Sequence, residues 1–146
     1  KPTCMNSKKF LVGTVVGGIV LFVLGYLFYG MLLLNFFTQH SHAPAGAEKA
    51  MSELVWWALI LGNLGTGALL TYVLLKLGNV NSFGSGAGIG AAVGFFGALG
   101  NDLVRYATEN ASDITGVLTD VVVFTVMCAI ASGVIVAVSG MGKKKS

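Results

Sequence analysis

Charged side chains are scarce in this sequence. Only 10% of its 146 residues are Asp, Glu, Lys or Arg, whereas 55% are hydrophobic. A soluble domain usually has about a quarter of its residues charged, because its surface must be hydrated. The shortage excludes a large soluble domain carried on a membrane anchor. It indicates that lipid is the main solvent of the chain.

Residues that carry enzymatic chemistry are equally few. The two cysteines, Cys4 and Cys128, fit neither a metal-binding spacing nor a disulfide framework, and Cys128 is expected to be a small apolar packing residue. The glycine-rich run at 84–90 lacks the Lys-Ser/Thr ending of a phosphate-binding loop. We therefore predict no enzymatic activity, no cofactor and no nucleotide site. A reaction on lipid through Asp120 and the histidines is the remaining enzymatic alternative.

What the sequence has in place of these features is four long apolar segments. Each is long enough, at ~20 residues or more, to cross a bilayer as a helix. The third has weaker hydropathy because it is so rich in glycine. We predict an all-α, polytopic membrane protein with a single four-helix transmembrane domain over residues 10–138. The predicted spans are 10–37, 54–75, 84–106 and 114–138.

Basic residues gather at the two ends of the chain. Lysines stand in the segments 1–9 and 139–146, each of which adjoins an apolar span. Positive charge beside a span is typical of the cytoplasmic side of a membrane, so we predict both segments there and no nucleic-acid partner. Four spans agree with this placement. A three-span alternative, with the glycine-rich segment as a loop, would put the two lysine clusters on opposite sides.

The beginning of the sequence bears on processing. Met5 is a plausible native start, so residues 1–4 are left out of the fold prediction. The apolar stretch between Lys9 and Phe37 is much longer than the roughly 7–15 residues of the apolar part of a signal peptide. We therefore expect no cleaved signal peptide.

Two Ser-acid pairs precede the second and fourth spans. Ser52 and Ser112 are predicted to cap these helices, with Glu53 and Asp113 beside the positive end of each helix dipole. The two halves of the chain therefore resemble each other faintly. This internal similarity is compatible with a duplicated helical hairpin, but any four-helix chain with capped helices would show it too.

Glycines recur at helical spacing in the first and third spans. Glycine every four residues forms a groove along one helix face, which lets another helix approach closely in lipid. The groove can serve packing within the bundle, a seam with another subunit or copy, or a glycine-lined pore. The predicted packing positions are Gly13, Gly17, Gly86, Gly90, Gly94 and Gly97.

Polar groups at membrane depth are the main candidates for function, because burying them in lipid is costly. Asp120 stands about two turns into the fourth span, roughly 9 Å from its start. The antiparallel third span ends at the same level with Asp102 and Arg105, which we expect to pair and to reach Asp120. The other polar residues predicted near this level are Asn35, Asn63 and Asn101.

This predicted cluster has three interpretations. In the first, Arg105 neutralises a carboxylate and fixes the register of the third and fourth spans. In the second, two acids sharing one base leave Asp120 free to bind a proton or another solute. In the third, the cluster is where a partner protein docks.

His40 and His42 lie in the loop after the first span. Imidazole is a common metal ligand, so the pair is a weak candidate for a metal site. Without a third ligand at a suitable spacing, two loop histidines are more often simply hydrated. We predict no metal.

The end of the first span, Val23-Leu24-Gly25-Tyr26-Leu27-Phe28-Tyr29-Gly30, resembles the Gly-x-x-aromatic-Tyr-Gly feature of the DUF1761 group of small four-span bacterial membrane proteins. The length and the span count also fit that group, whereas the segment 31–35 departs from its Pro- and Gly-containing continuation. The resemblance implies a four-helix architecture in a bacterial inner membrane. It implies no reaction.

Two functions follow from these patterns. The one favoured by the sequence is a non-enzymatic bundle that acts as an accessory subunit or homo-oligomer, associating through its glycine-rich faces. The alternative is a small transporter or channel for a solute, proton or ion that uses Asp102, Arg105 and Asp120.

Overall fold

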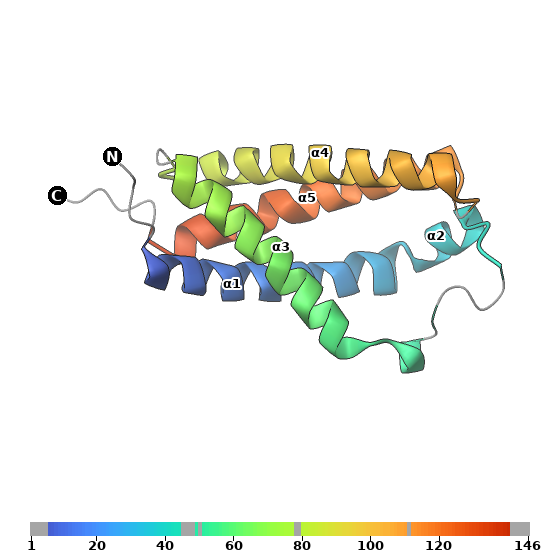
Figure 1. The fold of residues 1–146 in the computed structure, drawn as a ribbon, viewed down its shortest axis with the longest axis horizontal. Helices are drawn as coiled ribbons and strands as arrows, with labels where there is room; N and C mark the ends of the chain where they lie inside the picture. The colour runs from blue at the N-terminus through green and yellow to red at the C-terminus, as the bar shows by residue number, and fades with distance from the viewer. Residues whose placement is uncertain (1–5, 45–48, 50, 78–79, 111, 141–146) are drawn as a thin grey trace.

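The structure, a computed structural model, describes residues 6–44, 49, 51–77, 80–110 and 112–140. Four segments within these ranges are long and apolar enough to cross a membrane. The first combines α1 (Ser7–Gly25) with η1 (Tyr26–Leu32), and the others are α3 (Trp56–Leu77), α4 (Phe83–Thr108) and α5 (Ile114–Val138). The predicted all-α bundle with four spans is confirmed (Figure 1).

The glycine-rich third span is a continuous helix. α4 covers Phe83–Thr108, and Ser82 caps it by accepting a hydrogen bond from the Ser85 backbone N–H at 3.2 Å. The three-span alternative, which made this segment a loop, is therefore wrong. Glycine is a poor helix former in water, but in a bundle it can be retained where helices must approach closely.

The first span is not one uninterrupted α-helix as predicted. After α1 the chain forms a π-helix, η1, and a short helix α2 (Leu34–His40) follows. The Leu33 N–H donates to the Phe28 carbonyl, five residues back, at 2.8 Å. This wider turn changes which side chains face the bundle beyond Gly25, and such turns are often found at functional sites.

Both predicted serine caps are wrong. Ser52 lies in a single 3₁₀ turn, η2 (Met51–Glu53), and α3 begins only at Trp56. At α5 it is Asp113 that caps, accepting from the Gly116 N–H at 2.8 Å. Ser112 instead bridges to Ser41 in the loop after the first span. The two halves therefore do not share a cap structure.

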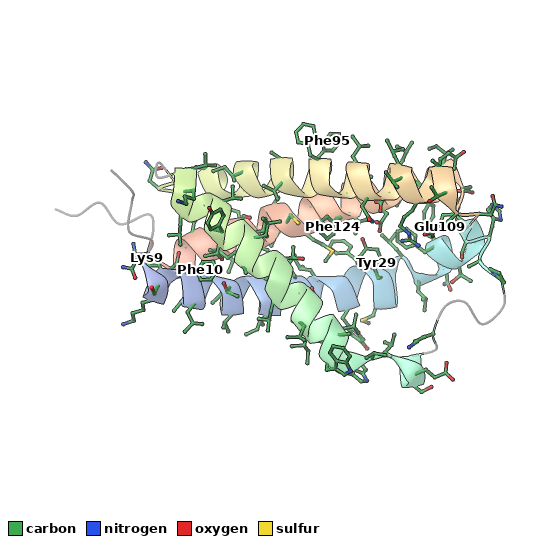
Figure 2. All side chains as sticks on the ribbon, viewed as in Figure 1. Lys9, Phe10, Tyr29, Phe95, Glu109 and Phe124 are labelled. Carbon is green, nitrogen blue, oxygen red and sulfur yellow. The ribbon has the colours of Figure 1, made fainter. Side chains whose placement is uncertain are left out.

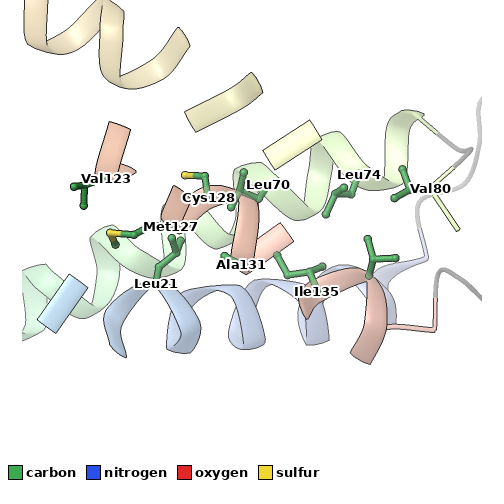
Figure 3. Close-up of a cluster of buried hydrophobic side chains, with 10 residues drawn as sticks. Leu21, Leu70, Leu74, Val80, Val123, Met127, Cys128, Ala131 and Ile135 are labelled. Carbon is green, nitrogen blue, oxygen red and sulfur yellow. The ribbon is translucent and has the colours of Figure 1, made fainter. Parts of the chain in front are cut away.

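The helices pack mainly as two pairs, α4 on α5 and α1 on α3, and α1 also packs on α5. A buried apolar cluster fills the middle of the bundle (Figure 3). It is formed by Leu21, Leu70, Leu74, Val80, Val123, Met127, Cys128, Ala131, Ile135 and Val136. Cys128 is a buried packing residue there, 1% exposed.

The predicted glycines on α4 face α5 of the same chain. A Cβ on Gly86, Gly90 or Gly94 would meet α5 atoms at a distance too short for a real contact. Gly97 differs, since a Cβ there would meet nothing within 4 Å. The buried row instead continues through Ala98 to Asp102, four residues at a time.

A second close approach joins α1 and α3. A Cβ on Gly67 would lie 2.6 Å from the Gly18 backbone nitrogen, and Gly13 and Gly17 face Thr71 and Ile135. The helices cross steeply here, so that the beginning of α3 diverges from the other spans (Figure 1). Of the six predicted packing glycines, five therefore serve contacts within the chain.

The first span begins and the last span ends at the same end of the bundle (Figure 1). The Lys9 ammonium donates a hydrogen bond to the Gly140 carbonyl at 3.3 Å. An even number of spans produces this arrangement. The assignment of this end to the cytoplasm stays a prediction, and residues 1–5 and 141–146 lie outside the described residues.

Candidate functional site

Asp120 on α5 is held by a tyrosine from the first span. The Tyr29 hydroxyl donates a hydrogen bond to the Asp120 carboxylate at 2.6 Å, and both side chains are partly buried. Tyr29 belongs to η1, so the π-helix positions this donor (Figure 2). Charge-assisted hydrogen bonds of this length are among the stronger ones in proteins.

Asp102 is the most deeply buried acid among the described residues. It lies at the end of the buried row on α4 and is 8% exposed. The Asn101 amide donates to its Oδ1 at 3.1 Å, whereas its Oδ2 has no hydrogen-bond partner. A buried acceptor without a donor is costly, so a ligand that donates a hydrogen bond to this oxygen would be favoured.

The structure brings Asp102 and Asp120 together. Both side chains line the same two pockets, one from α4 and the other from α5, and their charges lie close enough to interact. We refer to these two residues as the carboxyl pair. Two adjacent carboxylates in a poorly hydrated site repel each other, so the pair favours any cation that lies between them.

The predicted pairing of Asp102 with Arg105 is wrong. Arg105 forms an ion pair with Glu109, one turn further along α4, at 3.3 Å. Both side chains are about half exposed, so the pair contributes little to stability. Arg105 still lines the same pocket as the carboxyl pair and contributes positive charge near it.

The other predicted asparagines do not join the carboxyl pair. Asn63 donates to the Leu59 carbonyl of its own helix at 2.8 Å, and Asn35 is exposed on α2. Neither lines a pocket with Asp102 or Asp120. Of the three predicted asparagines, Asn101 alone contacts the pair.

The two histidines are placed differently. His40 stacks on Phe36 with ring centroids 4.2 Å apart, and its Nδ1 lies 2.9 Å from the Phe36 carbonyl oxygen. His42 lines the pocket that contains the carboxyl pair. Within the described ranges, no three His, Cys, Asp or Glu side chains gather as a metal site would require.

Two pockets meet at the carboxyl pair. The first, which we call the loop-side pocket, has a volume of about 840 Å³ and reaches the loops that follow α2 and α4. It is lined by three acids, Asp102, Glu109 and Asp120, but by one arginine, Arg105. This excess of acid favours cations over anions at the loop-side end of the bundle.

The second pocket, which we call the interhelical pocket, lies between α3, α4 and α5 and has a volume of about 340 Å³. Asp102 and Asp120 line it too, together with mostly apolar side chains such as Leu69, Val93 and Phe124. Figure 2 shows Phe124 in the middle of the bundle. The carboxyl pair is therefore reached from two sides.

Sequence reasoning missed Tyr29. An aromatic residue in an apolar helix is usually explained by lipid contact or packing, and its partner stands 91 positions away in the sequence. One signal was available, because the hydroxyl of a buried tyrosine nearly always has a hydrogen-bond partner. Asp120 is one of few side chains at that depth able to provide it.

Comparison with known proteins does not identify a family for this chain. No protein-family model matches the chain, and neither a curated protein nor a solved structure is found to be similar to it. The resemblance to the DUF1761 group therefore stays a prediction carried by the segment 23–30.

Proposed function

We propose that this four-helix membrane protein is a small, non-enzymatic transporter that takes up a cation, a proton in the simplest case, on Asp102 and Asp120. The observation that carries the proposal is the buried Oδ2 of Asp102, which has no hydrogen-bond partner although it lines two pockets. In a structural polar network the large majority of buried polar atoms have a hydrogen-bond partner, so this atom is better explained by a binding site.

The surroundings of the pair support this choice. The Tyr29 hydroxyl donates to Asp120 from the first span, and Arg105 on α4 forms its ion pair with Glu109. The loop-side pocket provides access for hydrated ions from one end of the bundle. By contrast, five of the predicted packing glycines are occupied by contacts within the chain, which weakens the argument for a subunit that associates through them.

Replacing Asp120 by Asn tests the proposal. In sealed vesicles with a pH-sensitive dye inside, we expect the protein to dissipate a pH gradient. Asp120→Asn should reduce that rate at least about tenfold, because intramembrane carboxyls of this kind carry the transported charge. Tyr29→Phe should give an intermediate rate, since it removes one hydrogen bond and leaves both acids in place.

Asp113→Asn is the matched control. It is the same carboxylate-to-amide change on the same helix, outside both pockets, and Asn caps a helix as well as Asp does. We expect it to transport like the unmodified protein. If Asp120→Asn and Asp113→Asn dissipate the gradient equally fast, the carboxyl pair does not carry the cation.

A second candidate function is association with another copy or subunit, as favoured by the sequence. The observation for it is a second row of small residues on α4: Gly84, Gly88 and Ala92 are exposed, and a Cβ on either glycine would meet nothing within 4 Å. Small residues at this spacing on a lipid-facing surface suit contact with another helix.

Gly88→Leu tests that second function. If α4 associates through this row, the larger side chain should weaken self-association in mild detergent by about tenfold or more, measured as a shift of the particle mass. Gly62→Leu, at a similarly open position on α3, is the control. Gly90→Leu would be a poor test, because α5 fills that position. An unchanged particle mass for Gly88→Leu would contradict association through α4.

A further inference from the structure

The interhelical pocket is not needed for a proton to reach Asp120 from the loop side. It reaches the same two carboxyls along a different, mostly apolar route. Its walls include Leu69 on α3, Val93 and Gly97 on α4, and Phe124 on α5. A Cβ on Gly97 would meet nothing within 4 Å, so this wall is open.

The interhelical pocket lies at the depth of the lipid interior. Leu69 and Gly97 are mid-span residues, and Leu69 is 52% exposed. α3 packs mainly on α1 and α4 mainly on α5, so few contacts close the space between α3 and α4. At mid-span depth the surrounding solvent is the lipid interior. The pocket is therefore open to apolar molecules in the bilayer.

The carboxyl pair at the inner end of this pocket requires a hydrogen-bond donor. Asp102 is more than nine-tenths buried, and its Oδ2 has no partner. A primary ammonium group has three N–H donors and a positive charge, so it can serve both carboxylates at once. A quaternary ammonium ion has the charge without the donors, and an anion would be repelled.

We propose that the carboxyl pair binds the head group of an amphipathic primary ammonium ion whose apolar tail occupies the interhelical pocket, which it enters from the bilayer between α3 and α4. This inference rests on the proposed cation uptake and names the class of the cation. The charged head then lies where the loop-side pocket begins, so the same pair faces both lipid and the loop side of the bundle.

The experiment uses radiolabelled octylammonium and the full chain in nanodiscs of uncharged phospholipid. Binding to protein-free nanodiscs is subtracted. We expect saturable binding that is lost in Asp102→Asn/Asp120→Asn. Octanol, which has the tail without the charge, and ethylammonium, which has the charge with hardly any tail, should compete at least about tenfold more weakly than unlabelled octylammonium.

Two variants narrow the pocket from opposite walls. Gly97→Leu fills it from α4 and Leu69→Trp fills it from α3, and each should weaken octylammonium binding about tenfold or more. Gly100→Leu is the matched control, since Gly100 has equally open surroundings and lines neither pocket. With one variant on each wall, the test remains valid even if one of the two variants fails to fold.

The outcomes separate this inference from the proposed function. If octylammonium shows no saturable binding while the pH gradient is still dissipated through Asp120, the inference is overturned and proton transport stands. If ethylammonium competes as well as octylammonium, or if neither pocket-filling variant weakens binding, the cation arrives from the loop side and the inference also fails. If the protein shows neither saturable octylammonium binding nor dissipation of the pH gradient, the inference and the proposed function are both wrong.

Discussion

Gly90→Ala should lower the free energy of unfolding by about 1–3 kcal/mol, the cost of forcing an extra methyl group into a packed interface. The added Cβ would collide with the Cys128 carbonyl oxygen and with the Ser132 side chain. A backbone oxygen cannot move aside as a flexible side chain does, so α4 and α5 would have to separate. Because these two helices form the most extensive contact in the bundle, the whole domain should be affected.

Gly88→Ala is the control for this prediction. It is the same chemical change on the same helix, two residues away, where a Cβ would meet nothing within 4 Å. The free energy of unfolding should stay unchanged or rise by up to about 1 kcal/mol, since alanine is the better helix former. Both variants can be compared by denaturation of the purified protein in mixed detergent micelles. Equal stability would mean that α5 does not lie against Gly90.

Asp102→Leu should stabilise the bundle while abolishing cation uptake. The unpartnered Oδ2 of Asp102 costs about 1–3 kcal/mol of folding free energy, and an apolar side chain of similar size removes that cost. Asn101, which donates to this carboxylate, is exposed and can find other acceptors. Stability and vesicle transport, measured on the same preparation, should therefore change in opposite directions.

The same variant decides between the interpretations of the polar cluster. If Asp102 were part of a structural ion network, its removal would leave a buried group unpaired and stability would fall by several kcal/mol (~3–5). Val104→Leu, at a lipid-exposed position on α4, should leave both measurements unchanged. A clear loss of stability in Asp102→Leu would favour the structural interpretation over the functional one.

Much of the fold could be predicted from the sequence, because composition and span length are strong signals in a membrane protein. α5 was predicted with its observed ends, and α4 within two residues of them. The π-helix η1 could not be predicted. A π-helix forms where backbone N–H groups bond to the carbonyl five residues back instead of four. The hydropathy of the sequence does not distinguish these two hydrogen-bond patterns.

The candidate site was predicted less well, for reasons of geometry. Asp102 and Arg105 are three residues apart and looked like a pair, but Asp102 continues the buried row of α4. Arg105 is turned toward the surface, where its long side chain can keep the charge hydrated and meet Glu109. The buried face of α4 is the one that packs on α5. The sequence of α4 alone does not show which face that is.

The crossing of α1 and α3 has a mechanical consequence. The backbones of the two helices approach each other most closely at Gly17, Gly18 and Gly67, and the Leu64 and Thr71 side chains of α3 lie against Gly18 and Gly13. Beyond this crossing, α3 begins with the exposed pair Trp56 and Trp57, residues that prefer the headgroup layer. A thinner bilayer should draw that end inward and tilt α3 about its glycine pivot. The width of the gap between α3 and α4 would then depend on membrane thickness.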